Sequence, residues 1–149
     1  MSFRTASYTN NGDGTVTDNN TLLMWEQKVA GSGCLHCVDD VYTFAATTSG
    51  FLAAINAEGG SGLGGHSDWR IPNVKELQSI VDYGVFNPSI DPVPVFGDTA
   101  FSTTTFYWSS STRALLTTDA WHVGFVNGAV NFHAKSNANF VRAVRGGCL

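Results

Sequence analysis

The sequence predicts an α+β fold, in which two short helices pack on a small, mainly antiparallel twisted sheet and long loops join the elements. Three observations predict it: two segments with helical apolar spacing in the middle of the chain, short strand-like segments at both ends, and an Asn-Gly hairpin signal near the carboxyl terminus. The length of 149 residues suits one domain, and we expect a single domain over residues 1–149.

The amino-terminal segment predicts two short strands around turns. The turn cluster Asn-Asn-Gly-Asp-Gly at residues 10–14 precedes Thr-Val-Thr-Asp, and a second Asn-rich turn precedes Leu-Leu-Met-Trp at residues 22–25. Asp13 and Asp18 are candidate calcium ligands, because the spacing partly matches a calcium loop. Val16 stands where such a loop needs glycine, so a hairpin turn is the preferred interpretation.

The first expected helix covers residues 51–56. Ser49 precedes it at the expected N-cap position, and Phe51 and Ile55 share one face because they are four residues apart. A Gly-Gly pair at residues 59–60 predicts where the helix ends. The Gly-rich loop that follows has no Lys-Ser/Thr pair, which argues against a phosphate-binding loop.

The second expected helix follows a capping box. Asn73 and Glu76 occupy its N-cap and N3 positions, and apolar residues then recur at helical spacing as far as Val81. In the preceding loop, Asp68 and Arg70 flank a tryptophan, and we expect them to form an ion pair that anchors the loop.

A long loop is expected over residues 85–106, and it holds three of the four prolines. Loops longer than roughly 12–15 residues inside a compact domain are usually functional or mobile. Asn87 and Asp91 are therefore candidate ligand-binding residues.

The last third of the chain predicts a hairpin. Strands at residues 120–126 and 129–135 flank an Asn-Gly pair at residues 127–128, which favours a two-residue type I′ turn. Such a turn places His122 directly opposite His133. The expected core face carries Trp121, Val123, Phe125, Val130 and Phe132, and the expected wet, polar face carries His122, Gly124, Asn131 and His133.

Histidines opposed in this way have Cβ atoms about 4.5–5.5 Å apart. They are open to three interpretations: exposed polar residues, contacts to a small ligand, or a transition-metal pair. Trp108, in an expected strand at residues 106–110, is either a core residue or a platform on which a sugar ring stacks. The candidate ligand-binding residues are Trp108, His122, Asn127, Asn131, His133, Asn87 and Asp91.

The three cysteines, Cys34, Cys37 and Cys148, cannot all pair within one chain. The Cys-Leu-His-Cys segment is open to several interpretations: structural or incidental cysteines, a small disulfide ring, a redox pair, or a zinc site completed by His36 and Cys148. A structural role is preferred, because the segment lacks the flanking strand and helix of a redox motif.

Composition excludes several classes of partner. Charged residues make up 13% of the chain and the net charge is −4, with only eight basic residues and no run of them, which argues against nucleic acid. No apolar stretch approaches the roughly 18 residues of a membrane span, so no membrane insertion is expected. The sequence does not start with a signal peptide, so we expect either a cytoplasmic protein or one whose leader or parent chain lies outside this sequence. The low-charge, Ser/Thr/Asn/Gly-rich, aromatic composition favours the second alternative, an extracellular, cell-surface or periplasmic binding domain.

Five motifs, taken together, are specific: Asn-Gly-Asp-Gly-Thr-Val-Thr-Asp-Asn (11–19), Asp-Trp-Arg-Ile-Pro-Asn-Val-Lys-Glu-Leu-Gln-Ser (68–79), Phe-Asn-Pro-Ser-Ile-Asp-Pro (86–92), Tyr-Trp-Ser-Ser (107–110) and Val-Arg-Ala-Val-Arg-Gly-Gly (141–147). They resemble the Lcl C-terminal domain family, found at the end of bacterial collagen-like adhesins. The resemblance implies a C-type lectin-like fold, related to the sulfatase-modifying domains, in an exported and sometimes trimeric bacterial module.

The resemblance also implies a non-catalytic adhesion module that recognises a glycan or a protein partner. Sulfated polysaccharides are the best-supported ligands of the family, but eight scattered basic residues make a polyanion a poor ligand for this chain. Alternatives are a structural domain that oligomerises its parent chain, for example as a homotrimer, and a sulfatase-modifying-type enzyme relic. We expect no enzyme, because no nucleophile stands beside a base with an orienting carboxylate. No cofactor is expected, with calcium left open.

Overall fold

The computed structural model describes residues 6–90 and 95–146, so Asp91 and Cys148 lie outside the described residues. The fold is α+β, as predicted, but the described strands form two sheets rather than one. The first sheet has the order β1-β2-β3-β9 and contains β1 (Tyr8–Asn10), β2 (Thr15–Asp18), β3 (Leu23–Glu26) and β9 (Val144–Gly146). The second has the order β4-β8-β5-β6-β7 and contains β4 (Val41–Thr43), β8 (Ala138–Phe140), β5 (Tyr107–Thr112), β6 (Asp119–Gly124) and β7 (Ala129–Ala134).

The carboxyl-terminal segment divides between the two sheets. The strand β8 pairs with β4 and β5, whereas β9 pairs with β3. The segment between them enters the core, where Val141, Arg142 and Ala143 are buried. The β5–β8 pair is parallel and the other strand pairs are antiparallel, so the prediction of mainly antiparallel pairing is confirmed.

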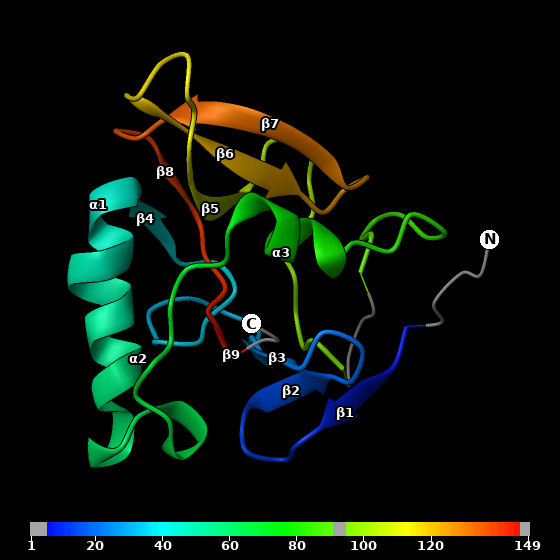
Figure 1. Ribbon diagram of the computed structural model, residues 1–149, viewed down its shortest axis with the longest axis vertical. Helices are drawn as coiled ribbons and strands as arrows, with labels where there is room; N and C mark the ends of the chain where they lie inside the picture. Colours follow the sequence, from blue (N-terminus) through cyan, green and yellow to red (C-terminus); the bar gives the residue numbers. More distant parts are fainter. Residues whose placement is uncertain (1–5, 91–94, 147–149) are drawn as a thin grey trace.

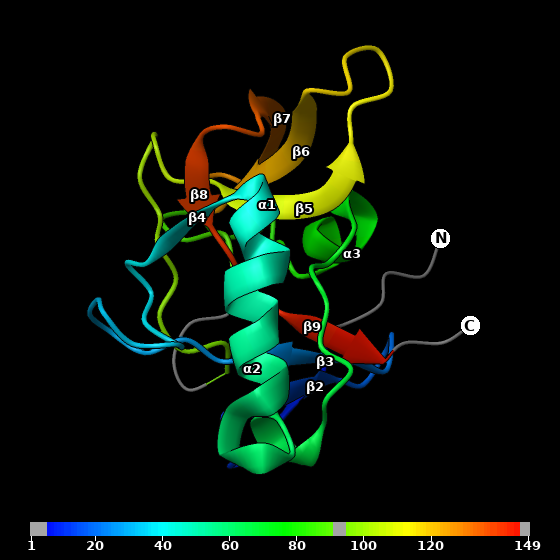
Figure 2. The ribbon, with the colours of Figure 1, turned by 90° about the vertical axis from the view of Figure 1, so that its left-hand side faces the viewer.

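A helical column covers one side of both sheets (Figure 2). It consists of α1 (Phe44–Ala46), the π-helical segment η1 (Thr47–Leu52) and α2 (Ala53–Ala57). The column begins earlier than predicted, because Thr43 at the end of β4 provides the N-cap and its hydroxyl accepts a hydrogen bond from the Ala46 N–H. Ser49 is therefore not the cap, and its hydroxyl instead donates to the carbonyl of Ala45.

The end of this column agrees with the sequence prediction. Phe51 and Ile55 point into the core together, and the chain leaves the helix at Gly59, which has a φ of 62°. Two single 3₁₀ turns follow, η2 (Glu58–Gly60) and η3 (Leu63–Gly65). A left-handed residue at this position is the normal stop signal of a helix.

The helix α3 (Val74–Ser79) begins with the predicted capping box. The side chain of Asn73 accepts the Glu76 N–H at 2.8 Å, and the Glu76 carboxylate accepts the Asn73 N–H at 2.9 Å. The Glu76 carboxylate also accepts hydrogen bonds from both terminal nitrogens of the Arg70 guanidinium, at 2.6 and 2.7 Å. The capping box fixes the carboxylate close to that side chain. The predicted Asp68–Arg70 pair is wrong, since Asp68 pairs with Arg145 instead.

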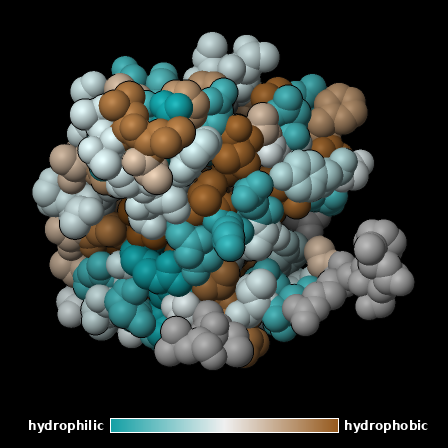
Figure 3. Space-filling view, turned by 45° about the horizontal axis from the view of Figure 1, so that its top comes forward, coloured by the Kyte–Doolittle hydropathy of each residue, from teal (hydrophilic) through white to brown (hydrophobic). Residues whose placement is uncertain are grey.

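Two apolar clusters fill the interior. One lies between the two sheets and α3 and is centred on large side chains such as Trp25, Phe96 and Tyr107. The other lies under the helical column and includes Phe51, Trp69 and Trp108. Outside, apolar side chains are interspersed with hydrophilic ones on the face shown in Figure 3. Within the described part of the chain, no helix is both long and apolar enough to cross a bilayer.

The predicted hairpin register is wrong by two positions. His122 pairs with Asn131, and His133 pairs with Ala120, because the turn spans the four residues 125–128 rather than two. The loop after α3 causes this change. The N–H groups of Asn87 and Ser89 bind the carbonyls of Val126 and Phe125, at 3.0 and 2.7 Å, so those residues are not available for hairpin pairing.

Candidate functional site

Two predicted ligand-binding residues, Trp108 and His122, lie inside the protein. Trp108 has no exposed surface, and its indole N–H donates to the carbonyl of Tyr42 at 2.9 Å. His122 is 2% exposed and stacks on Phe106 with ring centroids 4.1 Å apart. The expectation of a wet histidine face is therefore wrong, and neither ring is on the surface to contact a sugar.

His122 and His133 are diagonal neighbours with ring centroids 5.4 Å apart. Burial, together with the nearby His133, lowers the pKa of His122 to about 4, so that its ring is neutral at pH 7. His133 is half-buried, and its Nδ1 lies 3.3 Å from the side-chain amide nitrogen of Asn139. Asn131 is exposed on β7, where its side chain accepts the Phe132 N–H.

The two candidate calcium ligands organise turns. The carboxylate of Asp13 accepts the backbone N–H and the hydroxyl of Thr15. Asp18 is buried and accepts the Asn20 N–H at 2.9 Å. Over residues 6–90 and 95–146, no group of three or more His, Cys, Asp or Glu side chains could hold a metal ion. A role of these carboxylates in binding calcium stays a prediction.

The structure brings the other two described candidates, Asn87 and Asn127, into neighbouring turns. Asn87 is exposed in the loop after α3, and its N–H donates to the residue before Asn127. Two aromatic rings stand out beside them: Tyr83 is 68% exposed and Phe86 is 75% exposed. Together with the half-exposed Val85, these residues form a surface that we call the aromatic ledge: Tyr83, Val85, Phe86, Asn87 and Asn127.

The aromatic ledge is held by defined contacts. The Asp82 N–H donates to the Ser89 carbonyl at 2.9 Å, which closes the loop on itself. Gly128, with a φ of 79°, lies directly under the Tyr83 ring, and an added Cβ there would come within 2.9 Å of that ring. The Asn127 side chain accepts the Ala129 N–H at 3.1 Å, which orients the amide in its turn. The exposed rings therefore sit on an ordered base rather than on a free loop.

An open cleft of about 630 Å³ adjoins the ledge, and Tyr83 lines both. The cleft is lined by residues from the end of α3 and the segment after it, from β1 and from the turn between β2 and β3. Figure 1 shows the arrangement of these elements. Its volume falls within the roughly 300–1,000 Å³ of small-molecule sites. The polar side chains that line it belong to Asp18, Asn20, Thr21, Ser79 and Asp82.

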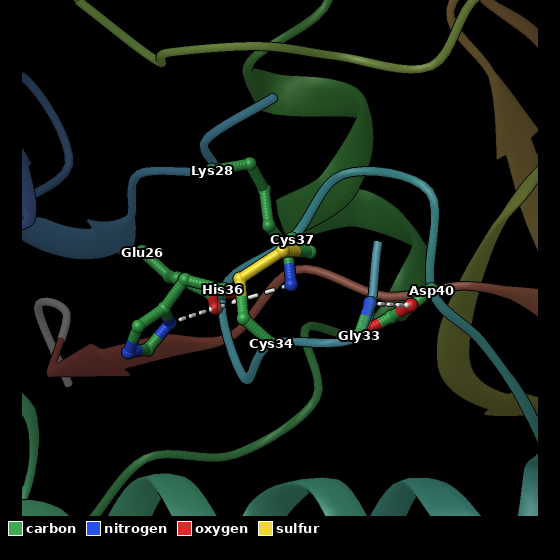
Figure 4. Close-up of a disulfide and its surroundings, with 7 residues drawn as sticks. All are labelled: Glu26, Lys28, Gly33, Cys34, His36, Cys37 and Asp40. Carbon is green, nitrogen blue, oxygen red and sulfur yellow. Dashed lines mark hydrogen bonds and ion pairs between the residues drawn. A yellow bond between two sulfur atoms is a disulfide. The ribbon is translucent and has the colours of Figure 1, made fainter. Parts of the chain in front are cut away.

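A second group of chemically notable residues surrounds the Cys34–Cys37 disulfide (Figure 4). The disulfide closes a small ring that carries His36, whose Nδ1 lies 2.6 Å from Glu26 and whose Nε2 lies 2.9 Å from Glu58. Of the sequence interpretations, the small disulfide ring is the one that the structure contains. Two sulfurs bonded to each other are not thiolate ligands, so the pair does not form a zinc site in this state. A redox role of the pair stays a prediction.

Glu26 is completely buried, and Lys28 beside it is nearly so, with a nitrogen–oxygen distance of 3.1 Å. Burial alone would raise the pKa of Glu26, but Lys28 and His36 hold that pKa below its ordinary value. Burial lowers the pKa of Lys28 against the opposing attraction of Glu26. Burial alone would lower the pKa of His36, but its contacts with the carboxylates of Glu26 and Glu58 raise that pKa above its ordinary value.

Arg142 completes this charged cluster, which we define as Glu26, Lys28, His36, Glu58 and Arg142. The Arg142 guanidinium has no exposed surface. It donates to the carbonyls of Glu26, Phe96 and Asp98 at 2.7–2.9 Å and to the Thr99 hydroxyl at 3.0 Å. It therefore fastens the second half of the long loop to β3.

Sequence reasoning missed the rings of the aromatic ledge. Their signal was present: the run Asp-Tyr-Gly-Val-Phe-Asn-Pro at residues 82–88 places two aromatic residues among turn formers, where no strand or helix face can bury them. The charged cluster was also missed, although Glu26 directly follows the apolar run Leu-Leu-Met-Trp.

The model of the Lcl C-terminal domain family matches residues 14–145. No curated protein and no solved structure matches the chain.

Proposed function

The chain belongs to the Lcl C-terminal domain family, and from that premise we propose that it is a non-catalytic, exported adhesion module that binds a glycan at the aromatic ledge. The single observation that carries this proposal is the pair of exposed rings, Tyr83 and Phe86, on an ordered base. Neighbouring apolar side chains that form an exposed patch with a polar rim mark interaction sites, whereas single exposed apolar residues do not.

The chemistry of the aromatic ledge suits a sugar. The apolar face of a sugar ring stacks on an aromatic ring, and side-chain amides can donate to and accept from its hydroxyls. Asn87 and Asn127 lie beside the rings and provide such amides. The C-type lectin-like architecture is part of the proposal, with the loop after α3 and the β6–β7 turn as the ligand-bearing segments.

The absence of catalysis is also a proposal, and the surroundings of the serines support it. Ser109 is buried and donates its hydroxyl to the carbonyl of Trp121 at 2.7 Å rather than to a histidine. His122 is held between aromatic rings, with no carboxylate hydrogen-bonded to it among the described residues. A nucleophile activated by an oriented base needs the opposite arrangement.

A glycan array, with and without calcium, tests the proposal. Wild type is compared with Tyr83→Ala/Phe86→Ala, and Phe101→Ala is the matched control because that exposed ring lies outside the ledge. We expect binding that the double substitution removes and the control retains. Binding that survives the double substitution, or its absence on every glycan, contradicts a glycan site at the ledge.

A second function, oligomerisation of a parent chain, is favoured by one observation. Leu115 is 89% exposed and the adjacent Leu116 is half-exposed, between β5 and β6. Sedimentation velocity tests this function. A trimer of the wild type that dissociates in Leu115→Ser/Leu116→Ser supports assembly through this turn, and a wild-type monomer at all concentrations contradicts it.

A further inference from the structure

Resting on the proposed function, we propose that the ligand is a neutral glycan that occupies two subsites. One sugar stacks on the aromatic ledge, and its neighbour lies in the cleft beside α3, with Asp82 as a hydrogen-bond acceptor. The cleft and the ledge meet at Tyr83, so a chain of two or more sugars spans both.

The cleft offers acceptors and hydroxyls. Asp82 is exposed, and one carboxylate oxygen accepts the Gly84 N–H at 2.8 Å, which fixes the side chain at the mouth of the cleft. The second oxygen has no partner within the described part of the chain. A carboxylate oxygen takes a sugar hydroxyl in a charge-assisted hydrogen bond, which is stronger than one between neutral groups.

The charges argue against a sulfated or uronic-acid polymer. Among the described residues, the cleft is lined by two carboxylates, Asp18 and Asp82, and by no basic side chain. A polyanion would therefore meet like charge where it needs cations.

Elsewhere on the surface, the basic groups are already engaged. Arg70 pairs with Glu76 and Arg145 pairs with Asp68. Most other described basic residues are similarly tied to a carboxylate, a carbonyl, a hydroxyl or an aromatic ring: Lys28, Arg113, Lys135 and Arg142. Lys75 is the one basic residue within 6–90 and 95–146 that makes none of these contacts, and one cation does not make a polyanion site.

Matched probes separate the two ligand classes. Isothermal titration measures dextran, mannan and chitohexaose against dextran sulfate and heparin, at 50 mM and 500 mM salt. We expect binding to at least one neutral probe with an affinity that salt changes little, because no ion pairs with the ligand are involved. A disaccharide of the bound type should bind more tightly than its monosaccharide.

Two substitutions probe the cleft. Ser79→Trp places a large side chain in it from the exposed end of α3, and we expect about a tenfold loss of affinity for the neutral probe. Asp82→Asn keeps the shape and removes the charge, with an expected loss of about three- to tenfold. Ala54→Trp, on the exposed side of α2, is the matched control, and thermal unfolding confirms that all three variants fold.

The outcomes separate this inference from the proposed function. Salt-sensitive binding to dextran sulfate or heparin that needs Tyr83 overturns the neutral class but leaves a glycan site at the aromatic ledge. Neutral binding that Ser79→Trp and Asp82→Asn leave unchanged overturns the cleft subsite alone. Failure of every probe to bind counts against the proposed function itself, and the inference falls with it.

Discussion

The charged cluster and the aromatic ledge differ in how far their side chains are engaged within the protein. Glu26, Lys28 and Arg142 are buried, and each is bound to partners in other segments of the chain. Tyr83 and Phe86 contribute little to the core and face solvent. The charged cluster therefore stabilises the fold, whereas the rings of the aromatic ledge keep exposed surface that a ligand can bury. Substitutions should separate the two: stability changes in one region, binding changes in the other.

The largest effect is expected at Arg142. Arg142→Met leaves the carbonyls of Glu26, Phe96 and Asp98 buried without their donor, and we expect a loss of about 3–5 kcal/mol in the free energy of unfolding. Urea denaturation measures it. Arg145→Met is the control, because its partner Asp68 is exposed, and it should cost about 1 kcal/mol or less. Equal losses in both variants would mean that burial of the guanidinium is unimportant.

His122 should give the next largest effect, as a dependence of stability on pH. Its pKa is about 4 in the folded protein and higher when unfolded, so the unfolded state binds more protons between these values. Stability should therefore fall by about 2–3 kcal/mol as the pH drops from 7 to 4. His122→Phe should lack this part of the decrease, since phenylalanine can stack on Phe106 and does not titrate. Parallel pH profiles of wild type and variant would contradict a buried neutral histidine.

His36 should show the opposite sign and a smaller effect. Glu26 and Glu58 raise its pKa against the effect of burial. The charged ring therefore stabilises the fold fully at pH values below the ordinary histidine pKa, and this stabilisation is lost as the pH rises through the pKa in the folded protein. His36→Gln should cost about 1 kcal/mol at pH 6 and less at pH 9. Denaturation at the two pH values measures the difference. A cost that does not change with pH would show that His36 carries no charge between the carboxylates.

The smallest effect on stability is expected at the aromatic ledge. Tyr83→Ala/Phe86→Ala should change the free energy of unfolding by about 0.5 kcal/mol or less per site, as surface substitutions usually do. The same variant should lose glycan binding. A large destabilisation would show that these two rings stabilise the fold, and it would contradict their assignment to a binding surface.

Local chemistry made part of the fold predictable from the sequence. The capping box at Asn73 and Glu76 and the glycine stop at Gly59 depend on neighbouring residues only, and the structure contains both. The helical column was harder to place, because its cap, Thr43, depends on where β4 ends. Local signals therefore predict helix ends well only when the helix does not continue from another element.

Tertiary contacts explain what the sequence could not predict about the site. The Asn-Gly pair indicated a two-residue turn, but Asn87 and Ser89 bind the carbonyls of Phe125 and Val126 and lengthen it. That shift moved His122 away from its expected partner, and Phe106 covered it. Hairpin propensity describes two strands alone and contains nothing about a loop from elsewhere in the chain. Asn87 and Asn127 were expected as separate candidates, and the same contacts place them in neighbouring turns.

In the proposed function, the ligand binds where side chains are least engaged within the protein. Amide chemical-shift mapping with the tightest-binding neutral oligosaccharide tests it most directly. We expect the shifted signals to cluster at residues 18–21, 79–90 and 125–128, with little change around Glu26 and Arg142. Shifts centred instead on His122 and His133, or on the turn at Leu115, would contradict it.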